Sequence, residues 1–164
     1  MTRAEKNQQI FRIRAFIPAD REFILSLVPR FSEFNLPEWR DANEINNTNR
    51  NALINAIDQP EQDVAILVAE DDAGAPLGFI HLQTKKDLFS GEKIGYISDL
   101  AVDKSFEGAG IGRMLLEAAE AWARQNGYRL LALYVFAENT RAQRVYEKQG
   151  FGREIVKYVK KVVS

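Results

Sequence analysis

The sequence predicts an α/β fold, in which strands and helices alternate along the chain. Three observations support this class: apolar runs with strand character, amphipathic segments at helical spacing between them, and a glycine-rich turn at residues 108–112 that joins a strand directly to a helix. The 164 residues include 46% apolar and 27% charged residues, which is typical of a globular protein. We therefore expect residues 1–164 to form one domain.

The N-terminal half is predicted to hold a strand, two helices and a hairpin. Asp20 is the expected cap of the first helix, while Pro29 and Pro37 are expected to end that helix and to begin the second. Residues 31–36 form an aromatic loop between them. An Asp-Asp-Ala-Gly turn at residues 71–74 predicts antiparallel pairing of the strands on either side. The expected elements are a strand at 10–17, helices at 21–28 and 37–57, and strands at 64–70 and 76–84.

The C-terminal half is predicted to alternate strands with amphipathic helices. Gly127 and Gly150 each follow a segment with apolar residues at helical spacing, and glycine is typical of helix C-termini. Residues 129–136 are largely apolar, which predicts a strand buried on both faces. The expected elements are strands at 93–102, 129–136 and 151–162, and helices at 110–126 and 138–149.

The glycine-rich turn has the features of an anion-binding site. Gly108, Gly110 and Gly112 allow positive φ and let a ligand approach main-chain N–H groups. The helix that follows offers unpaired N–H donors and the positive end of its dipole. No Gly-Lys-Ser/Thr follows, which argues against a nucleoside triphosphate loop, and the Gly-x-Gly-x-Gly spacing differs from the dinucleotide fingerprint. Glycine spacing alone also fits an ordinary tight turn.

A second motif lies about thirty residues further along the chain. Asn139, Ala142 and Tyr146 lie at positions i, i+3 and i+7 of a predicted helix and so share one face. Gly150 and Phe151 follow at the end of the helix.

The two motifs together resemble the GNAT superfamily of N-acetyltransferases. Members of that family typically carry Arg/Gln-x-x-Gly-x-Gly/Ala, followed by Asn-x-x-Ala-x-x-x-Tyr-x-x-x-Gly-Phe. The resemblance covers roughly residues 63–158, with a weaker similarity at residues 13–20. It departs from the family at Glu107, where Arg or Gln is usual.

The resemblance implies a mixed, mostly antiparallel sheet of six or seven strands with about four helices. In the family, the two strands on either side of the glycine loop and its helix splay apart and form the cofactor cleft. Their counterparts here are residues 93–102 and 129–136. A seventh strand is expected to be short or absent, and a partner subunit in a homodimer would complete such an edge.

The resemblance also implies that the cofactor is acetyl-coenzyme A (acetyl-CoA) and that no metal is needed. Backbone N–H groups of residues 107–112 would bind the pyrophosphate, and the free edge of residues 100–102 would pair with the pantetheine arm. Asn139 would hold the pantetheine amides. Arg113 would reach the phosphates, or it is simply a solvated cation. The expected cofactor-binding residues are Leu100, Ala101, Val102, Glu107, Gly108, Ala109, Gly110, Ile111, Gly112, Arg113, Asn139, Ala142 and Tyr146.

Acetyl transfer to an amine needs a proton for the leaving thiolate and a base for the amine. Tyr146 is the expected acid, because a phenol of pKa about 10 can protonate the thiolate of a thiol of pKa about 8.5. Core packing is the alternative role of this ring. Asp99 is the expected base or acceptor-binding carboxylate, since residues 98–102 resemble the acidic strand end of several branches of the family.

Three aromatic residues, Phe31, Phe34 and Trp39, are expected to bind the acceptor together with Asp99, although aromatic residues in loops more often cover a core. His81, the only histidine, lies in a predicted strand, where we expect a structural or acceptor-side role.

Composition excludes several classes of site. The absence of cysteine excludes disulfides, thiolate metal sites and a cysteine nucleophile, and one histidine excludes multi-histidine metal sites. Residues 1–82 carry a net charge of −5 and residues 83–164 a net charge of +4, which suits an anionic cofactor in the second half or merely a solvated surface. No basic stripe indicates nucleic acid binding, and no apolar run is long enough for a membrane span. Without a signal peptide, a cytoplasmic location is expected.

The sequence therefore predicts an acetyl-CoA-dependent N-acetyltransferase that transfers the acetyl group directly to a primary amine in a ternary complex. The acceptor is a small-molecule or peptide amine, and its identity stays open because acceptor loops vary within one architecture. Two alternatives also stay open: a non-catalytic acyl-CoA sensor or interaction domain on the same fold, and an unrelated nucleotide-binding domain.

Overall fold

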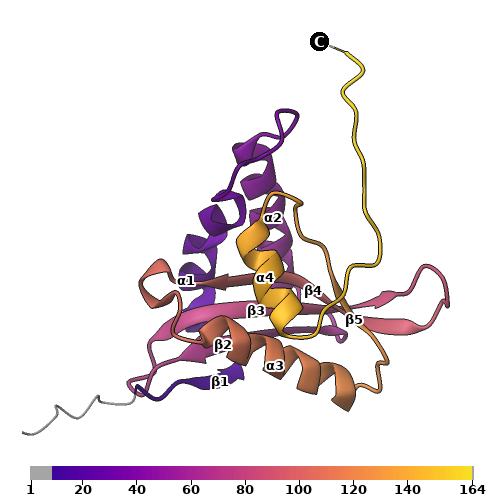
Figure 1. The fold of residues 1–164 in the computed structure, drawn as a ribbon. Helices are drawn as coiled ribbons and strands as arrows, with labels where there is room; N and C mark the ends of the chain where they lie inside the picture. The colour runs from indigo at the N-terminus through magenta and orange to yellow at the C-terminus, as the bar shows by residue number, and fades with distance from the viewer. Residues whose placement is uncertain (1–8, 164) are drawn as a thin grey trace, which may run out of the picture.

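A computed structural model describes residues 9–163 of the chain. Its centre is a five-stranded sheet in the order β1-β2-β3-β4-β5, with antiparallel pairing up to β4 and a parallel β5 (Figure 1). The strands are β1 (Arg12–Ala15), β2 (Val64–Glu70), β3 (Pro76–Lys86), β4 (Lys93–Val102) and β5 (Leu131–Leu133). The helices are α1 (Arg21–Ser26), α2 (Ala42–Asp58), α3 (Ile111–Gln125) and α4 (Thr140–Lys148), with 3-10 turns η1 (Pro18–Asp20), η2 (Val28–Ser32) and η3 (Lys104–Phe106).

Two apolar cores lie on opposite faces of the sheet. On one face α1, η2 and α2 pack against side chains that include Val68 and Phe79. On the other face α3 packs against side chains that include Ile80 and Leu82. Residues 77–82 of β3 are all buried, because Phe79 packs in the first core while Leu77, Ile80 and Leu82 pack in the second.

A β-bulge interrupts the pairing of β3 with β4. His81 lies opposite Asp99 and Leu82 lies opposite Ile97, so Ser98 has no counterpart on β3. A bulge bends a strand and increases its local twist. The two parts of β4 on either side of Ser98 therefore run in slightly different directions, which bears on the cleft described below.

Several expectations for the N-terminal half need correction. Helix α2 begins at Ala42 rather than at Pro37, because the Asp41 carboxylate caps it by accepting hydrogen bonds from two backbone N–H groups at 2.8 and 3.1 Å. Pro29 lies inside η2, and α1 has already ended at Ser26. Asp20 does not cap α1 with its side chain.

The Asp20 carboxylate instead joins β1 to the turn that follows it. It accepts hydrogen bonds from Arg14 at 2.7 and 2.9 Å and from the Ile17 N–H at 2.9 Å. Burial alone would raise the pKa of Asp20, but these bonds and the charge of Arg14 outweigh it and lower the pKa below its usual value. This ion pair holds η1 against the edge strand β1.

The predicted sheet of six or seven strands is also wrong in number, because the described residues form five. Strand β5 covers only Leu131–Leu133 of the expected 129–136, and its residues are half-buried rather than buried on both faces. It pairs with β4 at Gly95, Tyr96 and Ile97 and then diverges, so no ladder continues. Residues 151–162, expected to be a strand, pair with no other strand among the described residues.

The remaining elements agree closely with the expectations. Strands β2 and β4 have the predicted bounds, and the fold class is confirmed as a mixed, mostly antiparallel sheet with four α-helices. Helices α3 and α4 start one or two residues later than predicted and end one residue earlier.

Candidate active site

The cleft of the molecule forms where β4 and β5 separate. From Asp99 to Val102, β4 pairs with β3 only, so its other edge has no strand partner among residues 9–163. A cavity of about 820 Å³ lies along this edge. It is lined by Arg30, Glu33, Phe34, Leu100, Ala101, Val102, Phe106, Glu107, Gly108, Gly110, Ile111, Gly112, Arg113, Asn139, Arg141, Ala142, Val145, Tyr146, Lys148 and Gln149. The expected splaying of the two strands is confirmed.

Glycines in the turn before α3 keep one end of this cleft open. Gly108 and Gly110 have φ of 79° and 88°, a conformation that side-chain-bearing residues rarely adopt. A Cβ added at either position would meet no atom within 4 Å. Backbone conformation rather than crowding therefore requires glycine here, and the turn presents its main chain to open space.

The N-terminus of α3 supplies free N–H donors at the same end. The first helical bond runs from the Met114 N–H to the Gly110 carbonyl at 3.1 Å, which leaves the N–H groups of Ile111, Gly112 and Arg113 without helical acceptors. The N–H groups of Glu107 and Ala109 donate to carbonyls of η3, and Ala109 does not line the cavity. The donors available to an anion are thus fewer than the six expected from residues 107–112.

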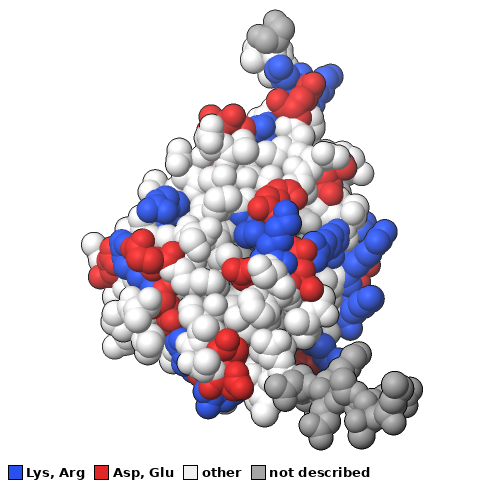
Figure 2. Space-filling model, turned by 90° about the vertical axis from the view of Figure 1, so that its left-hand side faces the viewer, with Lys and Arg blue, Asp and Glu red and all other residues white. Residues whose placement is uncertain are grey.

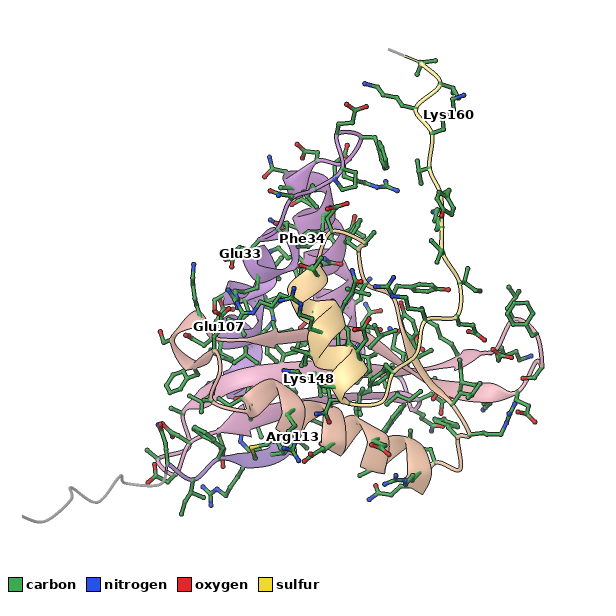
Figure 3. All side chains as sticks on the ribbon, in the orientation of Figure 1. Glu33, Phe34, Glu107, Arg113, Lys148 and Lys160 are labelled. Carbon is green, nitrogen blue, oxygen red and sulfur yellow. The ribbon has the colours of Figure 1, made fainter. Side chains whose placement is uncertain are left out.

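Glu107 lies between two arginines from distant parts of the chain. Figure 3 labels Glu107 on the turn that joins β4 to α3. Arg30 of η2 donates to one of its carboxylate oxygens, and Arg141 of α4 donates to the other at 2.8 Å. These hydrogen bonds, Arg30 first and Arg141 second, lower the pKa of Glu107. The carboxylate that departs from the family pattern is therefore neutralised by its neighbours.

Arg30 and Arg113 in the cleft lining also have acidic partners. Arg30 bonds Glu33 at 2.5 Å, and Arg113 bonds Glu117 at 2.7 Å one turn further along α3. Figure 2 shows basic and acidic side chains interspersed over the side of the molecule that carries the glycine turn. Electrostatic attraction for an anion would therefore come from local donors rather than from a large patch of one sign.

Helix α4 carries the second motif to the cleft. The Asn139 side-chain oxygen caps α4 by accepting from the Ala142 N–H at 3.2 Å, so its amide NH₂ remains as a donor. Asn139, Ala142 and Tyr146 all line the cavity, as their shared helix face predicts. Tyr146 is half-buried against Phe151, with ring centroids 5.9 Å apart, and burial raises the pKa of its hydroxyl.

Asp99 lies next to the cleft but does not line it. Its carboxylate bonds the His81 Nδ1 atom at 2.8 Å across the β3–β4 pair, and both side chains are buried. Within the described chain, His81 Nε2 and Ser98 Oγ are buried atoms without a hydrogen-bond partner. The bulge thus concentrates three polar side chains where β4 begins to separate from β5.

The three aromatic residues expected at the acceptor site have different places. Phe34 lines the cavity and packs on Phe136, with ring centroids 5.4 Å apart. Phe31 packs edge-on against Phe79 in the core and does not line the cavity. Trp39 is 40% exposed in the turn before α2 and also lies outside the lining.

Sequence reasoning missed seven lining residues. Arg141, Val145 and Lys148 lie at i, i+4 and i+7 on α4, next to the face that was identified, so their spacing was a usable signal. Arg30 and Glu33 come from a turn more than seventy residues before the glycine loop, where no local pattern marks them. The missed residues are Arg30, Glu33, Phe106, Arg141, Val145, Lys148 and Gln149.

Within residues 9–163, no three or more His, Asp or Glu side chains come together as a group able to hold a metal ion. Nor does that part of the chain contain a helix with the length and apolar character needed to cross a membrane.

Known proteins resemble this chain in sequence and in structure. A mycothiol acetyltransferase of Propionibacterium freudenreichii subsp. shermanii is 38% identical over 86 residues, which are 52% of this chain and 27% of the relative. An aminoglycoside N(6')-acetyltransferase type 1 of Stenotrophomonas maltophilia is 28% identical over 142 residues, covering 85% of this chain and 84% of the relative. The chain spans only 27 to 32% of the length of three mycothiol acetyltransferases that it matches.

The fold is also that of solved acetyltransferase structures. The aminoglycoside N-acetyltransferase AAC(6')-Iy, solved in complex with CoA, superposes with a TM-score of 0.70 at 20% identity, covering 94% of this chain and 97% of that one. The model of the acetyltransferase (GNAT) family matches residues 25–151. This match includes the glycine turn, the splayed strands and α4, and the chain belongs to the GNAT family of acetyltransferases.

Proposed function

We propose that this protein is an acetyl-CoA-dependent N-acetyltransferase that moves the acetyl group directly to a primary amine of a small molecule. One observation carries the proposal: a single cleft joins the N-terminus of α3 to an unpaired strand edge and to Tyr146. A thioester of coenzyme A presents a pyrophosphate, an amide-bearing arm and an acyl group in this same order.

The residues of the cleft fit such a donor. The N–H groups of Ile111, Gly112 and Arg113 suit a pyrophosphate, because a helix N-terminus binds anions and a Cβ added at Gly108 or Gly110 would meet no described atom within 4 Å. The free backbone groups of residues 98–102 suit the amides of the pantetheine arm, in the manner of an added strand. The free NH₂ of Asn139 is a further donor to that arm. When bound, the thioester supplies the activated acyl group.

Acetyl transfer then requires two groups of the protein near the sulfur: one that stabilises negative charge on the acetyl oxygen and one that donates a proton. A backbone N–H of the β4 edge stabilises the negative charge that develops on the acetyl oxygen. The Tyr146 hydroxyl gives its proton to the sulfur as the C–S bond breaks and the new C–N bond forms. Burial raises the pKa of Tyr146, so the phenol keeps its proton throughout the neutral range.

The amine must lose a proton before or during its attack. We propose Asp99 as the acceptor of that proton, because it lies at the start of the unpaired edge beside Leu100, which lines the cavity. The hydrogen bond to His81 holds the carboxylate in place. The Phe34–Phe136 pair forms an apolar wall for the acceptor. The names of the relatives, mycothiol and aminoglycoside acetyltransferases, support an amino-sugar derivative as the first acceptor class to test.

The decisive experiment incubates the purified chain with acetyl-CoA and a panel of amines, and measures released thiol together with product masses. The panel contains aminoglycosides, amino-sugar thiols, polyamines, amino acids and peptides. Amine-dependent thiol release with a matching acetylated product is expected. Tight binding of acetyl-CoA without release for any amine would favour a sensor. Thermal stabilisation by ATP or NAD but not by coenzyme A would indicate a nucleotide-binding protein instead.

A further inference from the structure

One basic side chain in the lining of the cleft differs from the others, because it has no acidic partner. The lining contains four basic residues, and three of them, Arg30, Arg113 and Arg141, form ion pairs with glutamates. The fourth is Lys148, which forms no ion pair with a carboxylate within residues 9–163. Its side chain is exposed, so its charge is available to a ligand in the cleft.

Lys148 lies beside the N-terminus of α3. Tyr146 and Phe151, which precede and follow it in the sequence, pack against the apolar cluster that contains Ile111 of the first turn of α3. Figure 3 labels Lys148 on the last turn of α4, just above the part of α3 that carries Arg113. Lys148 therefore neighbours the N–H donors that suit a pyrophosphate, but it comes from a different helix.

Coenzyme A presents two kinds of phosphate to such a pair of neighbouring sites. Each phosphate of its pyrophosphate carries one negative charge, whereas the 3'-phosphate on its ribose is a monoester with a charge of about −1.5 to −2 at pH 7. Aligned N–H groups at a helix N-terminus suit the pyrophosphate. A lysine ammonium is a compact point charge without the fixed fork of arginine, so it gains most from the more highly charged phosphate.

From this combination we propose that Lys148 binds the ribose 3'-phosphate of coenzyme A, so that the protein discriminates against dephospho-coenzyme A, which lacks this group. The inference rests on the proposed function, because it takes the pyrophosphate to lie at the α3 N-terminus. The ribose links the two phosphate groups directly, so they must occupy neighbouring places, as the α3 N-terminus and Lys148 do. Gln149 also lines the cavity and offers an amide NH₂ as a further donor.

The size of the discrimination follows from the exposure of Lys148. A hydrogen bond to a charged group stabilises more than an exposed ion pair does, and this contact combines both situations. We expect coenzyme A to bind about 5- to 20-fold more tightly than dephospho-coenzyme A at low salt. This preference should decrease as the salt concentration rises, because ions screen exposed charges.

Calorimetry of the full chain with both ligands tests the proposal. Lys148→Gln is expected to reduce the preference below about twofold by weakening coenzyme A alone, while the affinity for dephospho-coenzyme A stays the same. Lys148→Arg keeps the charge and should keep most of the preference. Lys86→Gln is the control, because it removes an exposed lysine at the end of β3 that lies outside the cavity lining.

The outcomes separate this inference from the proposed function. An unmodified chain that binds both ligands equally would overturn the inference and leave the proposed function intact. The same holds if Lys148→Gln weakens both ligands by one factor, since the lysine would then act on the pyrophosphate. A chain that binds neither ligand would overturn both.

Phosphorus NMR identifies which phosphate Lys148 contacts. The monoester of coenzyme A gives a resonance separate from those of the two pyrophosphate phosphorus atoms. Binding to the unmodified chain is expected to shift the monoester resonance, and Lys148→Gln should abolish this shift while the pyrophosphate shifts remain. If the substitution changes only the pyrophosphate resonances, the 3'-phosphate lies elsewhere and the inference is wrong.

Discussion

The two halves of β4 differ in strand pairing, although they belong to one continuous strand. Its first half pairs with β3 on one side and, at residues 95–97, with β5 on the other. Its second half, from Asp99 to Val102, pairs with β3 only, and residues 100–102 border the cleft. The comparison teaches that pairing is complete where the strand lies between two others and absent where we propose that its backbone groups bind the cofactor.

The largest expected effect is a loss of acetyl-CoA affinity on substitution of a glycine at the open end of the cleft, compared with a glycine in another turn. Gly110→Val would place a branched side chain at φ 88° in the anion seat, and we expect loss of acetyl-CoA affinity by at least about 1,000-fold by calorimetry. Gly91→Val is the control, because Gly91 has φ 71°, open surroundings and a place in the β3–β4 turn away from the cavity lining. Equal affinity of both variants would show that the seat lies elsewhere.

The next prediction compares the effects on kcat of substituting Tyr146, in the cleft, and Tyr96, on the paired half of β4. Tyr146→Phe is expected to lower kcat by about 10- to 1,000-fold with little change in cofactor affinity, since it removes the proton donor. Tyr96→Phe removes a hydroxyl from the fully paired half of β4. Burial, followed by the influence of Tyr134 and Asp99, raises the pKa of Tyr96 to about 12.

For this control, kcat should stay within about twofold, because Tyr96 does not line the cavity. Because burial also raises the pKa of Tyr146, its hydroxyl should not limit kcat until the pH rises above about 10. Unchanged turnover in Tyr146→Phe with an authentic acceptor would remove Tyr146 from the mechanism.

The paired half of β4 should respond in stability rather than in binding. A Cβ at Gly95 would lie 3.0 Å from Leu131 and 3.2 Å from Trp122, so Gly95→Ala is expected to lower the free energy of unfolding by about 1 to 3 kcal/mol. Gly152→Ala, in open space, is the control. Urea unfolding measures both, and calorimetry below the transition should show an unchanged affinity for acetyl-CoA. A large loss of affinity in Gly95→Ala would show that the paired half of β4 also contributes to binding.

The smallest expected effect concerns Glu107. Glu107→Gln would remove the carboxylate charge beside Arg141 and leave Arg30 paired with Glu33 alone, and we expect affinity for coenzyme A to rise by about 2- to 5-fold at low salt. Glu120→Gln, whose partner Arg124 lies outside the cavity lining, is the control.

The pH dependence has a defined sign. The arginines lower the pKa of folded Glu107, so its pairing stabilises the protein above the unfolded value of about 4.3 and is lost as the pH falls through the folded pKa. The unmodified chain and Glu107→Gln should therefore bind coenzyme A with increasingly similar affinity as the pH falls through the folded pKa of Glu107. Weaker binding by Glu107→Gln at neutral pH would show that the carboxylate positions the arginines for the ligand.

Local patterns predicted the parts of the fold that local physics decides. The bounds of β4 follow from its apolar run and flanking turns, and the shared face of Asn139, Ala142 and Tyr146 follows from helical spacing. The splayed strands came from the family resemblance. The strands predicted at 129–136 and 151–162 were too long and absent, respectively. A strand-like composition does not determine whether another strand edge is close enough for pairing.

The charge pattern of the site was beyond prediction from one sequence. Glu107 was visible as a departure from the family motif, but its neutralisation depends on Arg30, which comes from a turn that no motif marks. The hydrogen bond between His81 and Asp99 depends on the register set by the bulge at Ser98. Such contacts are fixed by tertiary packing, so they have no period or spacing along the chain.

The shortness of β5 has a consequence for how binding would be measured. Three ladder pairs and a helix α4 without a buried residue hold residues 131–148 to the rest of the molecule, so this segment opens locally at small cost in free energy. A ligand held between β4 and α4 would close it, and amide hydrogen exchange would slow there while staying unchanged in β2 and β3. Measured affinity would then include the free energy of closure, so two GNAT proteins with identical ligand contacts would differ in affinity if this segment were seated more firmly in one of them.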